Sequence, residues 1–318
     1  MKAFAALAFS LAVCSHAFAQ AYPAKPIHIV QPYQAGGPAE GLARMVGNKM
    51  AARLGQTVLI ETKVGAGGTI ATGYVAKAPA DGYTVLLAHV GPIALSPATQ
   101  KNLPYDVLRD FEPVCQLVAT PLLLVVRNDI PARTVKEFID YAKANPGQLT
   151  YGSIGVGSTS HLAGAMLDSM TGTKTLHVPF KGSAQTLVEM IGGRISYSFI
   201  GVSGSIQQAR AGQIRALAVT TQKRSSNLPD IPSVAETVPG FELNSWYGLM
   251  VPTGTPKAVV MKLQQEAVLA VNAPDVLEWM KVNGLDPQGS TPEEFGALVR
   301  SETDKWAKTI KAVNFSLN

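Results

Sequence analysis

The stretch Tyr151-Gly-Ser-Ile-Gly-Val-Gly-Ser-Thr-Ser-His161 predicts a short strand, a glycine-rich loop and the first turn of a helix. Its glycines allow the backbone to turn and to approach a ligand closely, and its hydroxyl residues can cap the helix. The first N–H groups of a helix lack partners within it and lie at the positive end of its dipole, so this loop is expected to bind a carboxylate or a phosphate. The candidate ligand-binding residues of the loop are Gly155, Gly157, Ser158, Thr159, Ser160 and His161.

The same order of elements occurs once more, near the N-terminus. Ile27-His-Ile-Val30 predicts a strand, Gln31-Pro-Tyr-Gln-Ala-Gly-Gly37 a glycine loop, and Pro38 the first position of a helix. Either loop alone could be an ordinary joint of an α/β protein. Together they favour two lobes that close on one acidic ligand. The candidate residues of this loop are Tyr33, Gln34, Ala35, Gly36 and Gly37.

The N-terminus predicts a secretory signal peptide. Lys2 precedes the mostly apolar run Ala3–Val13, and Ala17-Phe-Ala19 fits an A-x-A cleavage site. A lipoprotein signal at Cys14 fits less well, because Val13 stands where a small residue is needed. Cleavage after Ala19 would release a periplasmic chain of 318 − 19 = 299 residues.

Charge and cysteine content exclude several classes. The formal net charge of +5 is spread along the chain without a basic block, so a nucleic-acid partner is not expected. Cleavage would leave Cys115 as the last cysteine, with no partner for an intrachain disulfide. The histidines are widely separated and no pair has i, i+4 spacing, so no metal site is predicted.

Strands and helices alternate along the chain, which predicts an α/β fold built on mainly parallel sheets. Leu122–Val126 and Ser245–Val251 are expected to cross between two lobes, which is the architecture of a clamshell binding protein with two hinge crossings. The predicted organisation is a signal peptide over 1–19, a first lobe over 20–120, a second lobe over 121–245 and a return segment with C-terminal helices over 246–318.

Four further residues are candidates because they lie beside a glycine loop, a strand end or a crossing. His89 follows the predicted strand Thr84–Ala88, where ligands of parallel sheets gather. Lys181 is either a charge aimed at an anion or a solvated lysine. Phe180 and Trp246, with Tyr33, are either walls of a cleft or core aromatics.

Enzyme signatures are absent from the sequence. Gly155-x-Gly157-x-x-Ser160 lacks the third glycine of a dinucleotide fingerprint, and neither a P-loop nor a G-x-S-x-G elbow occurs. His161 lies in the first turn of the helix that follows the glycine loop at Gly155–Gly157, where its imidazole either donates to a ligand or packs against the loop. No cofactor and no catalytic residue is predicted.

Ordered segments over nearly the whole mature chain resemble the periplasmic solute receptors of tripartite tricarboxylate transporters, the Bug family. They are Tyr22–Ile27, Gly65–Gly68, Ala80–Tyr83, Leu103–Asp106, Gly157–Gly164, His177–Ser183, Leu217–Thr220, Leu228–Pro232 and Pro252–Pro256. The resemblance implies a two-lobed periplasmic binding fold without catalysis. It also implies a ligand carboxylate held by backbone amides and waters of the two glycine loops, and delivery of organic acids to membrane permease subunits.

The sequence departs from the family pattern in two places. Pro38 has no N–H and Ala39 no hydroxyl where relatives carry glycine and Thr or Ser, so the first loop offers fewer donors. Gly201, next to Val202, stands where many members carry an Asp after a strand. That loss leaves less to hold an ammonium group and more room for a bulky or second acidic end.

The sequence therefore predicts a monomeric receptor that binds a mono- or dicarboxylate and serves a permease. An aromatic dicarboxylate is one candidate ligand. A ligand-loaded sensor for a signalling partner would use the same closed form, so the sequence leaves that alternative open. An exported enzyme on acidic substrates, with His161 as acid or base, is the third alternative.

Overall fold

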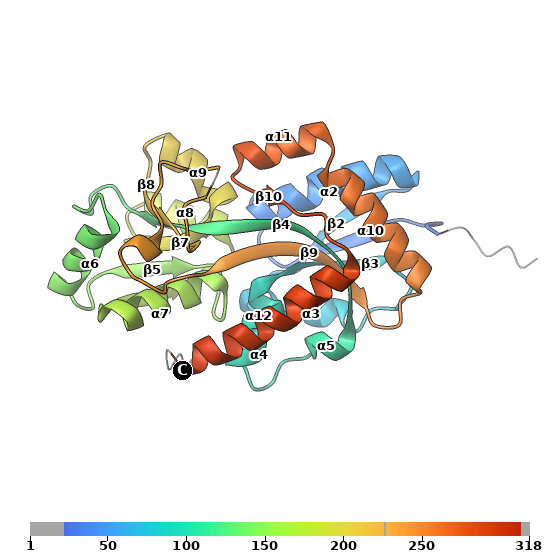
Figure 1. Cartoon of the computed structure of the whole chain (residues 1–318), viewed down its shortest axis with the longest axis horizontal. Coiled ribbons are helices and arrows are strands. Elements are labelled where there is room, and N and C mark those ends of the chain that lie inside the picture. The colour runs from blue at the N-terminus through green and yellow to red at the C-terminus, as the bar shows by residue number, and fades with distance from the viewer. Residues whose placement is uncertain (1–21, 226, 313–318) are drawn as a thin grey trace, which may run out of the picture.

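The computed structural model describes residues 22–225 and 227–312, so the predicted signal peptide and Cys14 lie outside the described residues. The molecule has two lobes, each with a sheet flanked by helices, and β4 and β9 run between them (Figure 1). Among the described helices, none is both long and apolar enough to span a bilayer.

The first lobe is built on a sheet of strand order β2-β1-β3-β9-β4, with β10 pairing the free side of β4. The first three strands are parallel, whereas β9 runs antiparallel to both β3 and β4. Its strands are β1 (Ile27–Gln31), β2 (Val58–Thr62), β3 (Thr84–His89), β4 (Phe111–Val126), β9 (Asn244–Pro252) and β10 (Asp286–Pro287).

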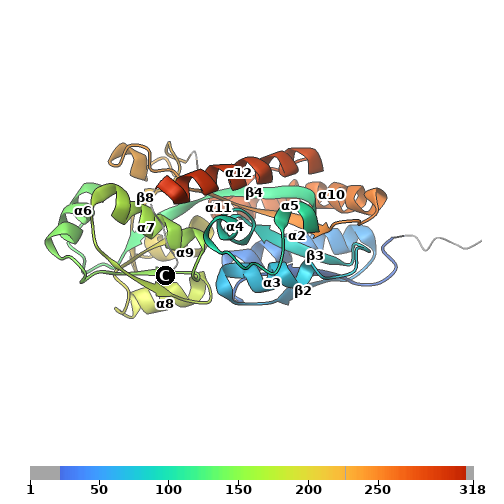
Figure 2. The ribbon, with the colours of Figure 1, turned by 90° about the horizontal axis from the view of Figure 1, so that it is seen from below.

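Helices cover both faces of this sheet, because alternate strand residues point to opposite sides. One apolar cluster joins the sheet to α2 (Pro38–Leu54), α10 (Lys257–Val271) and α11 (Pro274–Val282). A second joins the other face to α3 (Thr69–Val75), to η2 (Gly91–Leu95) and to α12 (Pro292–Ala312). Figure 2 shows α12 lying along β4. The short elements η1 (Ala66–Gly68), α4 (Ser96–Thr99) and α5 (Val107–Asp110) complete the lobe.

The second lobe has a smaller sheet in which β6, β5 and β7 are parallel and the end of β4 lies antiparallel to β7 and β8. Its strands are β5 (Thr150–Ser153), β6 (Leu176–Pro179), β7 (Tyr197–Gly201) and β8 (Arg215–Val219). Its helices are α6 (Val135–Ala144), α7 (Thr159–Thr171), α8 (Ser183–Ile191), α9 (Val202–Arg210) and η3 (Val234–Glu236).

Strand β4 belongs to both sheets, which is how the two lobes are joined. Its residues up to Pro121 pair with β9, and from Leu122 onward they pair with β7. Thr220 secures this change of partner, because its hydroxyl accepts from the Leu122 N–H (2.9 Å) and donates to the Leu243 carbonyl (2.6 Å). Strands β4 and β9 lie side by side where they pass between the lobes, with Thr120 opposite Ser245 and Pro121 opposite Asn244, whereas the predicted crossing Leu122–Val126 pairs with β7 and β8. The lobe limits given above stay a prediction.

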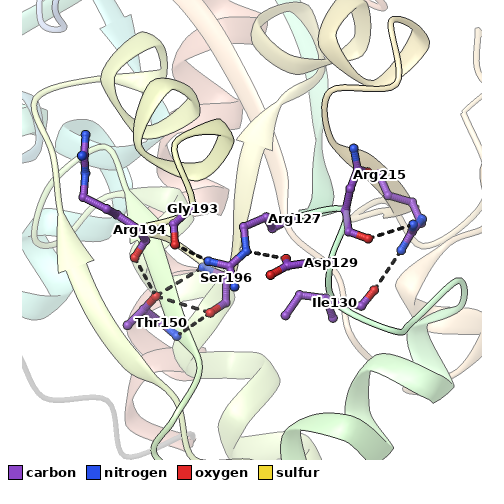
Figure 3. A network of polar contacts seen from close by, with 9 residues as sticks. Arg127, Asp129, Ile130, Thr150, Gly193, Arg194, Ser196 and Arg215 are labelled. Carbon is purple, nitrogen blue, oxygen red and sulfur yellow. Dashed lines mark hydrogen bonds and ion pairs between the residues drawn. The ribbon is translucent and has the colours of Figure 1, made fainter.

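A polar network holds the end of the second lobe that is remote from β9 (Figure 3). The Arg127 guanidinium binds Asp129 and donates to the Gly193 carbonyl, while Arg215 donates to the Ile130 carbonyl (3.0 Å). Thr150 and Ser196 exchange hydrogen bonds at the starts of β5 and β7. The amino ends of these parallel strands are thereby fixed, while their carboxyl ends face the other lobe.

Candidate ligand site

The carboxyl ends of four strands meet where the lobes face each other: β1 and β3 from the first lobe, β5 and β7 from the second. Helices α2, α7, α8 and α9 begin at the same place, with 17, 13, 9 and 9 residues. A cavity of about 20 Å³ lies between these helix starts. It is lined by Pro38, His89, Thr120, Leu122, Ile154, Thr159, Ser160, Ser183, Phe199, Gly201, Ser203, Ser245 and Tyr247.

The electrostatics of this cavity favour an anion. Four helix N-termini place partial positive charge there, and within the described part of the chain no lining residue is acidic. Thr159, the first residue of α7, is 1% exposed, and its hydroxyl has no hydrogen-bond partner among the described residues. A buried hydroxyl without a partner is costly, so a ligand or water oxygen is needed to complete it.

The second glycine loop is held by its own helix. Gly155 and Gly157 have φ of +124° and +77°, where a side chain would be strained. The Gly157 N–H donates to His161 Nδ1 (3.1 Å), and Ser158 Oγ caps α7 by accepting from the His161 N–H (3.4 Å). Ser160 Oγ accepts from the Ile154 N–H (3.0 Å). The loop is thus preorganised by contacts within the lobe.

His161 packs against this loop rather than lining the cavity. Its ring stacks on His177 with centroids 3.7 Å apart and planes 7° apart, and His177 Nε2 lies 2.6 Å from Ser153 Oγ. Burial, and then the neighbouring His177, lower the pKa of His161 to about 3, and burial lowers the pKa of His177 to about 4. Of the two roles considered for His161, the structure favours the packing role.

A polar chain connects the first loop to the cavity. Tyr33 Oη lies 2.7 Å from His89 Nδ1, and His89 Nε2 lies 2.8 Å from Ser245 Oγ. His89 is 2% exposed, and burial lowers its pKa to about 3, so its imidazole is neutral at ordinary pH. Tyr33 is itself fixed by Gln31, whose amide donates to its carbonyl and accepts from its N–H.

A groove of about 360 Å³ lies beside the cavity, and Ile154 lines both spaces. Its walls come from both lobes: Pro32, Tyr33, Gly65, Ala66, Gly67 and Gly68 from the first, and Ile154, Gly155, Val156, Pro179, Phe180, Lys181 and Gln185 from the second. The lobes touch here, because the Gln34 N–H donates to the Lys181 carbonyl (3.2 Å). Lys181 therefore joins the two lobes through its backbone carbonyl and is also one of the residues that line the groove.

Comparison with known proteins identifies the class of molecule to which this site belongs. The sequence model of one protein family, the tripartite tricarboxylate transporter family receptor, matches residues 42–315 of this chain. The chain belongs to this family. The receptor is similar to BugD, a periplasmic binding protein, with 36% identity, a TM-score of 0.89 and coverage of 93% of this chain and 99% of that one. The Bug resemblance and the two-lobed binding-protein fold predicted from the sequence are confirmed.

Two other solved relatives carry organic acids. Rpa4515 of R. palustris, solved with adipate, is 34% identical with a TM-score of 0.90, over 93% of this receptor and 99% of that chain. MatC from Rhodopseudomonas palustris, solved with bound malate, is 30% identical with a TM-score of 0.87, over 91% of this receptor and all of that chain. The family and these neighbours are solute-binding receptors.

Several residues proposed from the sequence do not line either space in the receptor. Trp246 is wrong as a cleft wall: it points to the opposite face of β9 from Ser245 and packs edge-on against Phe295, with centroids 5.3 Å apart. The Val202 side chain is buried in the core of the second lobe. Gly36 is exposed, and its N–H donates to Glu40 Oε2 (2.7 Å) rather than facing a ligand.

The rest of the first loop contributes less than expected. Ala35 is exposed, and Gly37 is the N-cap of α2, directly before Pro38. Gln34 contacts the second lobe instead of the cavity: a Cβ added at Gly182 would lie 3.1 Å from Gln34 Cβ. The anion-favouring groups therefore come mainly from the second lobe and from the crossing strands.

Sequence reasoning missed the hydroxyl residues that complete the cavity, namely Thr120, Ser183, Ser203 and Ser245. Ser183 and Ser245 stand in stretches that were singled out for other reasons, the Lys181 loop and the second crossing. Their positions could have identified them: Ser183 is at the start of a helix and Ser245 is on a crossing strand, and both places face the ligand at the carboxyl edge of a sheet. The loop Gly65–Gly68, which the sequence marks only as a segment shared with the family, forms one wall of the groove.

Proposed function

We propose that the receptor captures an organic mono- or dicarboxylate between its lobes and delivers it, unchanged, to the membrane permease subunits of a tripartite transporter. The observation that carries this proposal is the meeting of four helix starts at one buried cavity lined with hydroxyl groups. A carboxylate placed there would accept hydrogen bonds from Thr159 and Ser245 and from the free N–H groups of α7.

The rest of the ligand is proposed to extend from the cavity past Ile154 into the groove. The volume of the groove, about 360 Å³, is within the range typical of small-molecule sites. Phe180 and Tyr33 offer apolar surface and Lys181 offers a charge for a second acidic end. Relatives solved with adipate and with malate support a dicarboxylate, and the aromatic walls keep a benzene dicarboxylate among the candidates.

Gly201 supports acids over amino acids. A Cβ at this position would meet no heavy atom within 4 Å, so the backbone here borders open space in the cavity. The resemblance places an Asp at this point in many members, and its absence removes a partner for a ligand ammonium group. We propose that simple organic acids bind more tightly than aspartate or glutamate.

The proposal is tested by thermal-shift and calorimetric screening of the mature protein against malate, adipate, benzene-1,4-dicarboxylate, aspartate and glutamate. A ligand present at 100 times its dissociation constant stabilises the folded protein by about 2.7 kcal/mol. We expect at least one simple dicarboxylate to do so and to be recovered chemically intact. A preference for the amino acids, or conversion of the ligand, would contradict the proposal.

We further propose that the chain is exported, cleaved after Ala19 and works as a periplasmic monomer. The basic start, apolar run and A-x-A motif of the sequence support this. Intact-mass measurement of the chain from a periplasmic extract is expected to give residues 20–318, and light scattering a single chain. Retention of residues 1–19, or a lipid on Cys14, would refute the export pathway proposed here.

A further inference from the structure

The buried chain Tyr33–His89–Ser245 raises the question of which way its hydrogen bonds run. A neutral imidazole carries one hydrogen, so one ring nitrogen donates and the other accepts. If His89 Nε2 accepts, the Ser245 hydroxyl donates its hydrogen to the imidazole ring, and only its oxygen lone pairs face the cavity. If Nε2 donates, Ser245 Oγ accepts from the ring, and its hydrogen is left for a ligand.

Backbone geometry decides between these two arrangements. The Gly91 N–H lies at the start of η2, has no partner within that helix, and points at His89 Nδ1 from 3.3 Å. A hydrogen on Nδ1 would face this N–H, so Nδ1 must accept. Tyr33 donates to the same nitrogen, and burial raises the pKa of its phenol, which keeps it protonated. The hydrogen of the imidazole therefore sits on Nε2 and is donated to Ser245 Oγ.

We propose that His89 is a positioning residue that turns the Ser245 hydroxyl into a hydrogen-bond donor for the ligand carboxylate. Ser245 is 1% exposed, lines the cavity and has no other hydrogen-bond partner among the described residues, so its hydrogen points to the space between the helix starts. Gly91 and Tyr33 thus donate hydrogen bonds to His89, His89 donates to Ser245, and Ser245 donates to the ligand.

This arrangement selects the charge of the ligand as well as its position. A donor hydroxyl meets a carboxylate oxygen favourably, whereas an accepting hydroxyl would repel it and would suit an ammonium or amide N–H. Because the donor lies on a crossing strand and the four helix starts provide the remaining positive potential, one imidazole tautomer biases the whole cavity toward anions. The inference that Ser245 donates to a carboxylate rests on the proposed function. The tautomer of His89 does not depend on it.

The first experiment needs no ligand. Long-range ¹H–¹⁵N correlation spectra of the mature protein report which imidazole nitrogen carries the hydrogen, and loss of the signal in His89→Gln assigns it. We expect the hydrogen on Nε2. A hydrogen on Nδ1, or a mixture of the two tautomers, would overturn the inference whether or not any carboxylate binds.

The second experiment is a double-mutant cycle, with adipate as the probe. Ser245→Ala and His89→Phe should each weaken binding about 10- to 100-fold, as expected for a lost hydrogen bond to a charged group. The double variant should bind as weakly as Ser245→Ala alone, because His89 acts through Ser245. Additive losses, or undiminished binding by His89→Phe, would refute the positioning role.

Two further variants separate positioning from general damage to the fold. In His89→Gln the side-chain amide can still donate to Ser245, so we expect partial recovery of affinity relative to His89→Phe. Tyr33→Phe leaves the Gly91 N–H in place, so the hydrogen should remain on Nε2 in the ¹H–¹⁵N spectrum. Equal loss in the Gln and Phe variants, with both folded by thermal unfolding, would contradict the inference. Failure of wild type to bind any of the screened dicarboxylates would count against the proposed function, while the tautomer measurement still decides this inference.

Discussion

At the scale of single residues, Gly201 makes the preference for acids testable. A Cβ at position 201 would meet no heavy atom within 4 Å. A carboxylate there, beside a ligand carboxylate, adds charge repulsion and buries an unpaired anion. We expect Gly201→Asp to weaken binding of the best dicarboxylate by about 1 to 3 kcal/mol in titration calorimetry. Gly201→Asn has nearly the same shape without the charge and is the matched control. Equal losses in both variants would mean that bulk, not charge, decides.

Thr159 and Thr220 separate a hydroxyl that serves a ligand from one that serves the fold. The Thr159 hydroxyl lacks a partner, so Thr159→Val should not lower the free energy of unfolding of the ligand-free protein but should weaken carboxylate binding. Thr220→Val removes a hydroxyl that serves Leu122 and Leu243, and should cost about 1 to 3 kcal/mol of stability. Chemical denaturation and calorimetry on both variants check this contrast, and a Thr159→Val protein that binds normally would contradict it.

Two buried histidines, His89 and His161, and the partly buried His177 predict how stability depends on pH. The pKa values of His89 and His161 are about 3 and that of His177 about 4, against 6.5 for the ordinary side chain. The unfolded chain thus binds these protons first as pH falls. The contribution of the neutral rings to the free energy of unfolding is fully present above about pH 6.5 and is lost as the pH falls toward 4 to 3.

The window between pH 6.5 and 5 tests this dependence, because most carboxylates do not yet titrate there. The free energy of unfolding should fall by up to about 1.4 kcal/mol per pH unit for each proton, and by less for His177, which is partly exposed. His177→Gln should reduce the slope. Urea unfolding at several pH values measures it, and a flat profile across the window would be inconsistent with neutral buried rings.

Much of the site could be predicted at this scale, but not the direction of its side chains. Glycine spacing and the hydroxyl run at Ser158–Ser160 located the second loop, because those residue types have a local conformational meaning. The sequence leaves open whether Trp246 faces the cleft or the core, because a strand alternates its faces and the sequence near a crossing does not say which face meets the ligand. The side-chain hydrogen-bond partners of His89 lie 56 and 156 residues away, beyond any local pattern.

At the scale of elements, local signals fixed type and limits well. The sequence predicts a helix over Val135–Ala144, and α6 has these limits. It also predicts a capping box at Thr291–Glu294, and in the structure Thr291 Oγ1 accepts from the Glu294 N–H (3.1 Å) while Glu294 Oε2 accepts from the Thr291 N–H (2.9 Å). Strand β4 differs. Only its last five residues were expected to cross between lobes, whereas 16 residues form one strand.

The reason for this difference is the partners of β4, which are set by tertiary structure. Its first part contains exposed and partly exposed residues among buried ones and pairs with β9, while Leu122–Val126 is fully buried between β7 and β8. The sheets are consequently mixed: three parallel strands in each lobe, as the alternation of strands and helices predicted, and antiparallel crossings between them. Pairing over more than a hundred residues of separation is invisible to local propensity.

At the scale of the whole molecule, the proposed capture of a ligand between the lobes can be tested at one glycine. A Cβ at Gly67 would lie 2.5 Å from the Val156 carbonyl oxygen, which belongs to the other lobe. A contact this short cannot form, so Gly67→Ala should leave each lobe folded but disfavour the closed arrangement. Ligand affinity is reduced in proportion to the fraction of molecules able to close.

Gly36 is the matched control for this experiment. Both glycines have positive φ, +64° at Gly67 and +83° at Gly36, so alanine adds backbone strain at each, but a Cβ at Gly36 meets nothing within 4 Å. Since ligand binding draws on the closed population, we expect wild type and Gly36→Ala to show a smaller radius of gyration in X-ray scattering when saturated with ligand. Gly67→Ala should contract less and bind at least tenfold more weakly, because each 1.4 kcal/mol of closing penalty costs a factor of ten. If Gly67→Ala binds and contracts like Gly36→Ala, ligand capture does not depend on the contact between Gly67 and Val156, and the lobes must close in a different arrangement from the one in this structure.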